Sequence, residues 1–202
     1  MAAGKVTTGF SKPYVAVYAA NGTTVTYSNG QLLARGVEVS LEPESSDDNK
    51  FYADNIEAEN AKGEFTGGSV KFTVDGLKDE AERLIYGLPA ASNDGWTEYG
   101  DDMNVPFCGV GFIARQQSGG VVTYTPTILR KVMFKLKTDS AKTQEDAIDW
   151  QTQELEASIY RSDDVNRSWK SLGKEYSTEA EAETALRSKL GITQALTALE
   201  EE

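Results

Sequence analysis

The stretch VEVSLEPESSDDNKFYADNIEAENAKGEFTGGSVKFTVDGL, residues 37–77, carries the clearest strand patterns in the chain. At its start Val37, Val39 and Leu41 alternate with polar residues, and between 65 and 74 apolar residues alternate again. A period of two with one apolar face is typical of a half-buried β-strand. The stretch therefore predicts a strand at each of its ends and a mainly β protein.

The segment between these two strands, residues 42–60, holds seven acids and one lysine. Its length exceeds what a compact turn needs, and Phe51, Tyr52 and Ile56 distinguish it from a plain solvated tract. We predict an extended acidic hairpin or loop at about 42–64 that leaves the main body of the protein.

Further strands are predicted on both sides of this stretch. Before it, segments 13–20 and 23–27 flank Asn21-Gly22, a dipeptide that favours a tight hairpin turn, and a second turn is expected at Asn29-Gly30. After it, strands are expected at the segments 106–116, 121–138 and 148–160, with a turn at 118–120. Pro126 lacks a backbone donor, so a bulge or a sheet edge is expected there.

Two helices are predicted. The segment 77–87 has an apolar stripe around Ala81, and Gly87 favours a left-handed helix stop. Near the C-terminus Thr178 and Glu181 match a capping box, which marks a helix start. The expected class is mainly β with flanking α (α+β). We divide the chain into a β-rich domain, 1–176, and a helical C-terminal extension, 177–202.

Composition narrows the possible functions. The 202 residues carry a formal net charge of −12 and include no histidine. Because histidine is absent, the chain lacks the commonest general base and the commonest zinc ligand. Because the net charge is negative, the chain should repel nucleic acid phosphates and not bind them. No apolar run is long enough to span a membrane, and none follows Lys5, so we expect no secretory signal and folding in a cytoplasm.

Candidate chemistry is sparse. Glu154 and Glu156 lie two apart on an expected strand, as glycosidase carboxylates can, but solvent-facing residues give the same pattern. Asp47 and Asp48 lack the spacing of a calcium loop, and the single cysteine, Cys108, has no histidine partner and is expected to be buried and inert. We predict no catalytic residue, no cofactor and no metal site.

Several motifs, taken in order, resemble one family. Residues 37–77 are similar to the central block of siphophage major tail proteins, in which an acidic strand end is followed by a Y-A-D hairpin and an E-F-T-G-G turn. Here these motifs occupy residues 52–54 and 64–68. Residues 105–115, VPFCGVGFIAR, resemble the family's next strand, with Phe-Cys-Gly where Tyr-Val-Ala is commoner. The resemblance extends over roughly 30–170.

The resemblance implies packed antiparallel β-sheets, as a sandwich or barrel, and a non-enzymatic structural protein of the virion. The family's subunits form homohexameric rings that stack into the tail tube of a long, non-contractile tail. A tape-measure protein fills the lumen before genomic DNA passes through without specific binding, and tail terminator and distal tail proteins close the ends. The subunit would be made in the bacterial host cytoplasm and would touch no membrane.

Two sets of site residues follow from this interpretation. The residues expected at subunit or ring contacts are Phe51, Tyr52, Asp54, Ile56 and Phe65. The acids expected to face the lumen are Glu38, Glu42, Glu154 and Glu156. Two alternatives remain at this point. One is a β-sandwich carbohydrate-binding or adhesion module, and the other is a glycoside hydrolase that uses Glu154 and Glu156.

Overall fold

The computed structural model describes residues 4–47, 49–53, 56–61, 63–92, 94–139 and 151–192. The strands are β1 (Val6–Asn21), β2 (Thr24–Leu32), β3 (Gly36–Ser45), β4 (Asn49–Ala53), β5 (Ile56–Ala61), β6 (Phe65–Val74), β7 (Cys108–Ser118), β8 (Val121–Phe134), β9 (Gln153–Ile159) and β10 (Lys170–Leu172). The helices are α1 (Asp79–Tyr86) and α2 (Glu179–Lys189).

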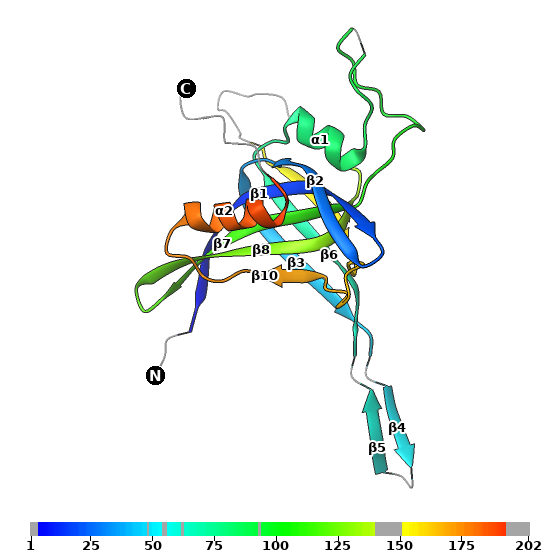
Figure 1. Ribbon diagram of the computed structural model, residues 1–202, viewed down its shortest axis with the longest axis vertical. Helices are drawn as coiled ribbons and strands as arrows, with labels where there is room; N and C mark the ends of the chain where they lie inside the picture. The colour runs from blue at the N-terminus through cyan, green and yellow to red at the C-terminus, as the bar shows by residue number, and fades with distance from the viewer. Residues whose placement is uncertain are drawn as a thin grey trace.

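Eight strands form one antiparallel sheet in the order β2-β1-β7-β8-β9-β6-β3, with β10 paired to β8. The sheet curves until its two halves face each other, so that β1, β7 and β8 cross in front of β3 and β6 (Figure 1). Phe10 of β1 accordingly packs against Phe72 of β6, with ring centroids 6.2 Å apart. The predicted class, mainly β with flanking α (α+β), is confirmed. The two layers that face each other are halves of one continuous sheet.

Apolar side chains form two clusters, one on each face of the β1–β7–β8 half. The inner cluster lies between the halves of the sheet and is closed at one end by Ala81, Ile85 and Tyr86 of α1. The outer cluster lies under α2, which covers the other face (Figure 1). The residues of α2 in this outer cluster are Ala182 and Leu186, and Leu190, which caps the helix at its C-terminal end, continues the row. Their four-residue spacing places them on one face of the helix.

Both predicted helices are confirmed. Gly87 has a φ of 61° at the end of α1, where its N–H bonds to the carbonyl of Arg83. At the start of α2 the Thr178 hydroxyl accepts a hydrogen bond from the Glu181 N–H at 3.3 Å. This satisfies one of the N–H groups that a helix start leaves without a partner in the helix.

The first hairpin is confirmed, but its details differ from the prediction. Its two-residue loop is Gly22-Thr23, because Asn21 still pairs with Thr24. The turn predicted at Asn29-Gly30 is wrong. These two residues lie inside β2 and form a bulge, since the β1–β2 register shifts there and Asn29 has a φ of 53°. A bulge also accommodates a left-handed residue without reversing the chain.

The register also corrects two predictions about single residues. Val37 is 57% exposed rather than buried, because the β3–β6 register shifts between Gly36 and Glu38 and takes Val37 out of the alternation. The bulge or edge predicted at Pro126 is wrong, because β8 pairs with β7 there without a shift. The Pro126 carbonyl accepts a hydrogen bond from the Gly173 N–H, so the backbone polar groups of Pro126 face away from β7. The N–H that proline lacks would point the same way, and its absence therefore costs no hydrogen bond between β7 and β8.

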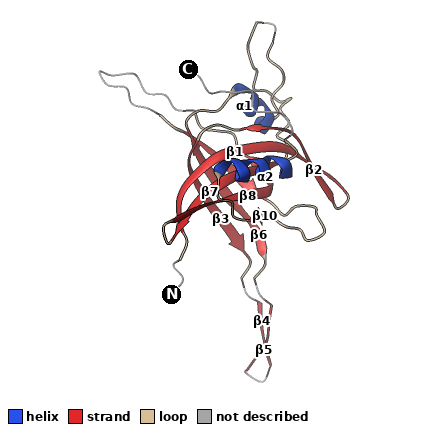
Figure 2. Cartoon of the chain, turned by 60° about the vertical axis from the view of Figure 1, so that its left-hand side comes forward, coloured by secondary structure: helices blue, strands red, loops and turns tan. Residues whose placement is uncertain are grey.

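The extended hairpin that was predicted to leave the main body is confirmed. β4 and β5 pair as a separate two-stranded sheet, with Asn49 opposite Ala61 and Ala53 opposite Ile56. Strands β3 and β6 lead into this hairpin, and the hairpin projects away from the curved sheet in both views (Figures 1 and 2). Residues 140–150, where a polar loop and the start of the last long strand were predicted, lie outside the described residues.

Candidate interaction face of the sheet

Strands β3, β6 and β9 lie side by side and send alternate side chains to opposite faces. The inner face is part of the core. Its fully buried residues on β6 and β9 are Val70, Phe72, Val74, Leu155 and Ala157. The outer face is polar. We call this outer face the acidic face, and its residues are Glu38, Ser40, Glu42, Ser69, Lys71, Thr73, Glu154, Glu156 and Ser158.

The pairing register brings all four acids that were predicted to face a lumen onto this acidic face. Thr73 pairs with Glu38 on one side and with Glu154 on the other. Lys71, two residues earlier, pairs with Glu156 in the same way. Because neighbouring strands lie about 4.8 Å apart, the Glu38 and Glu154 backbones are about 10 Å from each other. The acids form one surface although more than a hundred residues separate them in the chain.

Two lysines partly offset the negative charge of the acidic face. The Lys135 ammonium lies 2.5 Å from a carboxylate oxygen of Glu156. The hydrogen bond from Lys135, with added attraction from Lys135 and Lys71, lowers the pKa of Glu156. Glu38, Glu42 and Glu154 are exposed and make no salt bridge with any other described residue. The acidic face therefore keeps a net negative charge.

The same geometry bears on the glycosidase interpretation. A general acid in such an enzyme needs a carboxyl group with a raised pKa. The pKa of Glu156 moves in the opposite direction because Lys135 stabilises the ionised form. An open hollow of about 530 Å³ adjoins Glu154 and Glu156, and residues 135–139 and 151–154 form its two walls. Residues 140–150, which join these walls, lie outside the described part of the chain.

The predicted contact residues lie on or beside the hairpin. Phe51 and Tyr52 belong to β4, and Ile56 begins β5, while Asp54 lies outside the described residues. Phe65 begins β6 and stacks on Trp169, with ring centroids 4.6 Å apart and planes 4° from parallel. The hairpin is thus attached to the body at an aromatic base. The role of these five residues in a subunit contact stays a prediction.

Other chemistry is limited in the described part of the chain. Cys108 is buried, as expected, and burial raises the pKa of its thiol to about 12, which disfavours the reactive thiolate. The described residues contain no group of three or more histidine, cysteine or acidic side chains placed to hold a metal ion. No described helix has the length and apolar character needed to cross a membrane.

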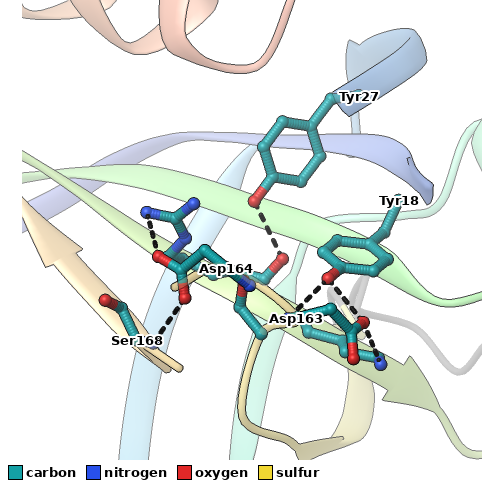
Figure 3. A network of polar contacts seen from close by, with 8 residues as sticks. Tyr18, Tyr27, Asp163, Asp164 and Ser168 are labelled. Carbon is teal, nitrogen blue, oxygen red and sulfur yellow. Dashed lines mark hydrogen bonds and ion pairs between the residues drawn. The ribbon is translucent and has the colours of Figure 1, made fainter. Parts of the chain in front are cut away.

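A polar network that no sequence pattern had indicated fixes the loop between β9 and β10 (Figure 3). The Tyr18 hydroxyl donates to the Asp163 carboxylate at 2.7 Å and accepts from the Asp163 N–H at 2.8 Å. The Lys131 ammonium lies 2.7 Å from the same carboxylate and faces the rings of Tyr18 and Phe107. Hydrogen bonds from Lys131 and Tyr18 lower the pKa of Asp163.

A second half of the network holds the rest of this loop. The Asp164 carboxylate accepts from the Ser168 N–H at 2.8 Å and lies 3.4 Å from the Arg130 guanidinium. The Tyr27 hydroxyl donates to the Arg130 carbonyl, and burial raises the pKa of Tyr27 to about 12. Alternating strand patterns give no signal for this network, because its members come from β1, β2, β8 and a loop. It holds the loop that leads into β10 against the sheet.

One loop exposes aromatic side chains. Between α1 and β7, Trp96 is 71% exposed, and Tyr99 is exposed while its hydroxyl donates to Glu82 at 2.7 Å. The Ser92 N–H donates a hydrogen bond to the Trp96 carbonyl, which closes a turn in this loop. Such a ring is free to contact another molecule.

No protein-family model matches the chain, and no curated protein matches its sequence.

Proposed function

We propose that this protein is the major tail tube subunit of a long, non-contractile-tailed bacteriophage. The observation that supports this proposal best is the acidic face, which gathers Glu38, Glu42, Glu154 and Glu156 on a sheet whose β3–β6 end extends into the projecting hairpin. The motif order that resembles siphophage tail proteins points to the same function.

In the proposed tube, the curved sheet forms part of the wall and the acidic face lines the lumen. Edge strands of a sheet offer free backbone groups and can pair with another copy. Ring closure limits lateral growth, while head-to-tail stacking allows length. The projecting hairpin reaches a neighbouring copy. Acids on the lumen wall keep DNA phosphates from binding, since binding requires basic side chains that displace counterions.

Electron microscopy of the purified protein tests this proposal. We expect rings or tubes with sixfold symmetry after concentration at about neutral pH. A reconstruction should place the acidic face toward the lumen. Monodisperse monomers at high concentration and in high salt would count against the tube, and an acidic face on the outer surface would count against the lumen role.

A second candidate function, a carbohydrate-binding or adhesion module, is favoured by the exposed Trp96 and Tyr99. Exposed aromatic rings can stack on the apolar faces of sugars, and large exposed rings often mark binding surfaces. Glycan-array binding by the wild-type protein, lost in Trp96→Ala, would support this function. If the wild-type protein binds no glycan on the array and forms tubes, the carbohydrate-binding function is excluded.

A further inference from the structure

The segment 165–174, which contains β10, is cationic in a chain of net charge −12. Among the described residues, Arg167, Lys170 and Lys174 form no salt bridge. Lys170 and Lys174 instead lie near the Trp169 and Tyr176 rings, with the ammonium groups 5.8 and 5.0 Å from the ring centroids. Lys174 is exposed and Lys170 is half-buried.

The carboxylates nearest to this segment are already paired with cations from elsewhere. The three pairs are Asp163 with Lys131, Asp164 with Arg130, and Glu175 with Lys5. Their negative charges are therefore largely offset. Arg167, Lys170 and Lys174 remain as an excess of positive charge on one surface.

The same segment offers an open strand edge and apolar side chains. β10 pairs with β8 along one side, and no other described strand pairs with it. Leu172 is 66% exposed and Val165 is 80% exposed. A free edge flanked by exposed apolar side chains can accept an extended segment of another chain. The positive charge favours a segment that is acidic.

We propose that this β10 surface, residues 165–174, binds the acidic hairpin of a second copy of the chain. The hairpin with its stem, residues 42–60, holds seven acids and one lysine. Glu44 and Asp47 on the stem are exposed, and neither forms a salt bridge among the described residues. The hairpin points away from its own body in both views, so it is placed to reach another copy (Figures 1 and 2).

This contact is heterologous, because a protruding segment of one copy meets a different surface of the next. Such contacts propagate in one direction and build rings or filaments. The inference rests on the proposed function, since it names the surface that receives the hairpin within an assembly of identical copies.

Charge reversal on the β10 surface tests the inference. We expect Lys170→Glu/Lys174→Glu to weaken self-association measured by analytical ultracentrifugation by about tenfold or more, because attraction between exposed charges becomes repulsion. The matched control is Lys78→Glu/Lys189→Glu, which changes the net charge equally at exposed lysines that form no described salt bridge. The control should associate like wild type. Higher salt should reduce the difference between the two variants.

Complementation between two variants adds a stricter test. Glu44→Lys/Asp47→Lys should also associate poorly alone, and mixing it with Lys170→Glu/Lys174→Glu should restore association between unlike copies. Circular dichroism must show that each variant keeps the wild-type fold. If wild type assembles and the β10 variant assembles equally well, or if mixing restores nothing, the inference is wrong while the proposed function stands. A wild-type chain that never associates would overturn both.

Discussion

At the residue scale, two glycines set how closely the C-terminal helix packs on the sheet. A Cβ atom at Gly111 would lie 2.5 Å from a methyl carbon of Leu186, and one at Gly30 would collide with the Ile192 side chain. Helix α2 is further held where the Tyr14 hydroxyl donates to the buried Glu183 carboxylate at 2.5 Å. Because Gly30 and Gly111 have no side chains, the sheet leaves space there for α2 and the residue Ile192 that follows it.

The packing of α2 leads to a first prediction. Gly111→Val should lower the free energy of unfolding by about 1–3 kcal/mol, because the added methyl groups overpack the space beneath Leu186. Urea unfolding followed by circular dichroism measures the loss. Gly76→Val is the control, since a Cβ atom there meets nothing within 4 Å. Equal stability of the two variants would mean that α2 is not packed as described.

The polar network leads to a second prediction, which concerns pH. Asp163→Asn should lower the free energy of unfolding by about 1 kcal/mol at pH 7, because the hydrogen bonds from Lys131 and Tyr18 lose their charged acceptor. The pKa of Asp163 is lowered in the folded state, so its contribution is complete above the unfolded pKa of about 3.9 and disappears as pH falls through the folded value.

Unfolding curves at pH 7 and at about pH 3 measure this dependence. The difference between wild type and Asp163→Asn should shrink at the lower pH. A difference that is independent of pH would show that the asparagine acts through packing and not through the lost charge.

At the element scale, the β4–β5 hairpin and the body are joined at a narrow base. The Ser46 N–H donates to the Glu64 carbonyl at 2.8 Å, and the Glu64 N–H donates back to the Ser46 hydroxyl at 3.0 Å. Arg161 pairs with Glu64 and also donates to the Phe65 carbonyl. These contacts join the two ends of the hairpin at its base. All of them are made by residues outside 47–63, so they do not depend on the hairpin itself.

This closed base leads to a third prediction. Replacing residues 47–63 with an Asn-Gly turn should leave the melting temperature within a few degrees of wild type and abolish assembly, because the hairpin is expected to serve contacts with another copy. Thermal unfolding and sedimentation velocity measure the two effects. Normal tubes from the shortened chain would refute the assembly role, and a collapse of the melting temperature would refute the independence of the hairpin.

At the scale of the whole molecule, the curved sheet has one apolar and one charged surface on its β3–β6–β9 half. The Debye length at physiological salt is about 8 Å, so charges on a tube wall act on DNA only across a narrow gap. If the acidic face lines that gap, its charge should influence how fast DNA leaves while the fold is unchanged.

A fourth prediction follows for the assembled tube. Glu38→Lys/Glu42→Lys should leave tube assembly intact and slow DNA ejection, because each added lysine pairs with phosphates. Ejection from reconstituted particles at low and high salt measures the effect, and high salt should relieve it. Glu154→Gln/Glu156→Gln, which removes charge without adding cations, is the comparison and should leave infectivity intact. An unchanged ejection rate at low salt would argue against the lumen role.

Local patterns in the sequence determined much of the fold. Period-two alternation gave β6 its observed bounds, Phe65–Val74, because burial of one face imposes that period on any strand. The stop at Gly87 and the cap at Thr178 were also predictable, since both depend on backbone groups within one turn of the helix. The alternation further predicted that Glu38 and Glu154 point out of the sheet.

Strand neighbours and register were decided by the tertiary structure. Alternation gives the face of a residue but not the strand that lies beside it, so the sequence could not show that Glu38 and Glu154 flank the same Thr73. The same holds for Asn29-Gly30, which fits a turn or a bulge until the partner strand is fixed. Pairings between distant segments depend on how the whole core packs, and no local pattern encodes that packing.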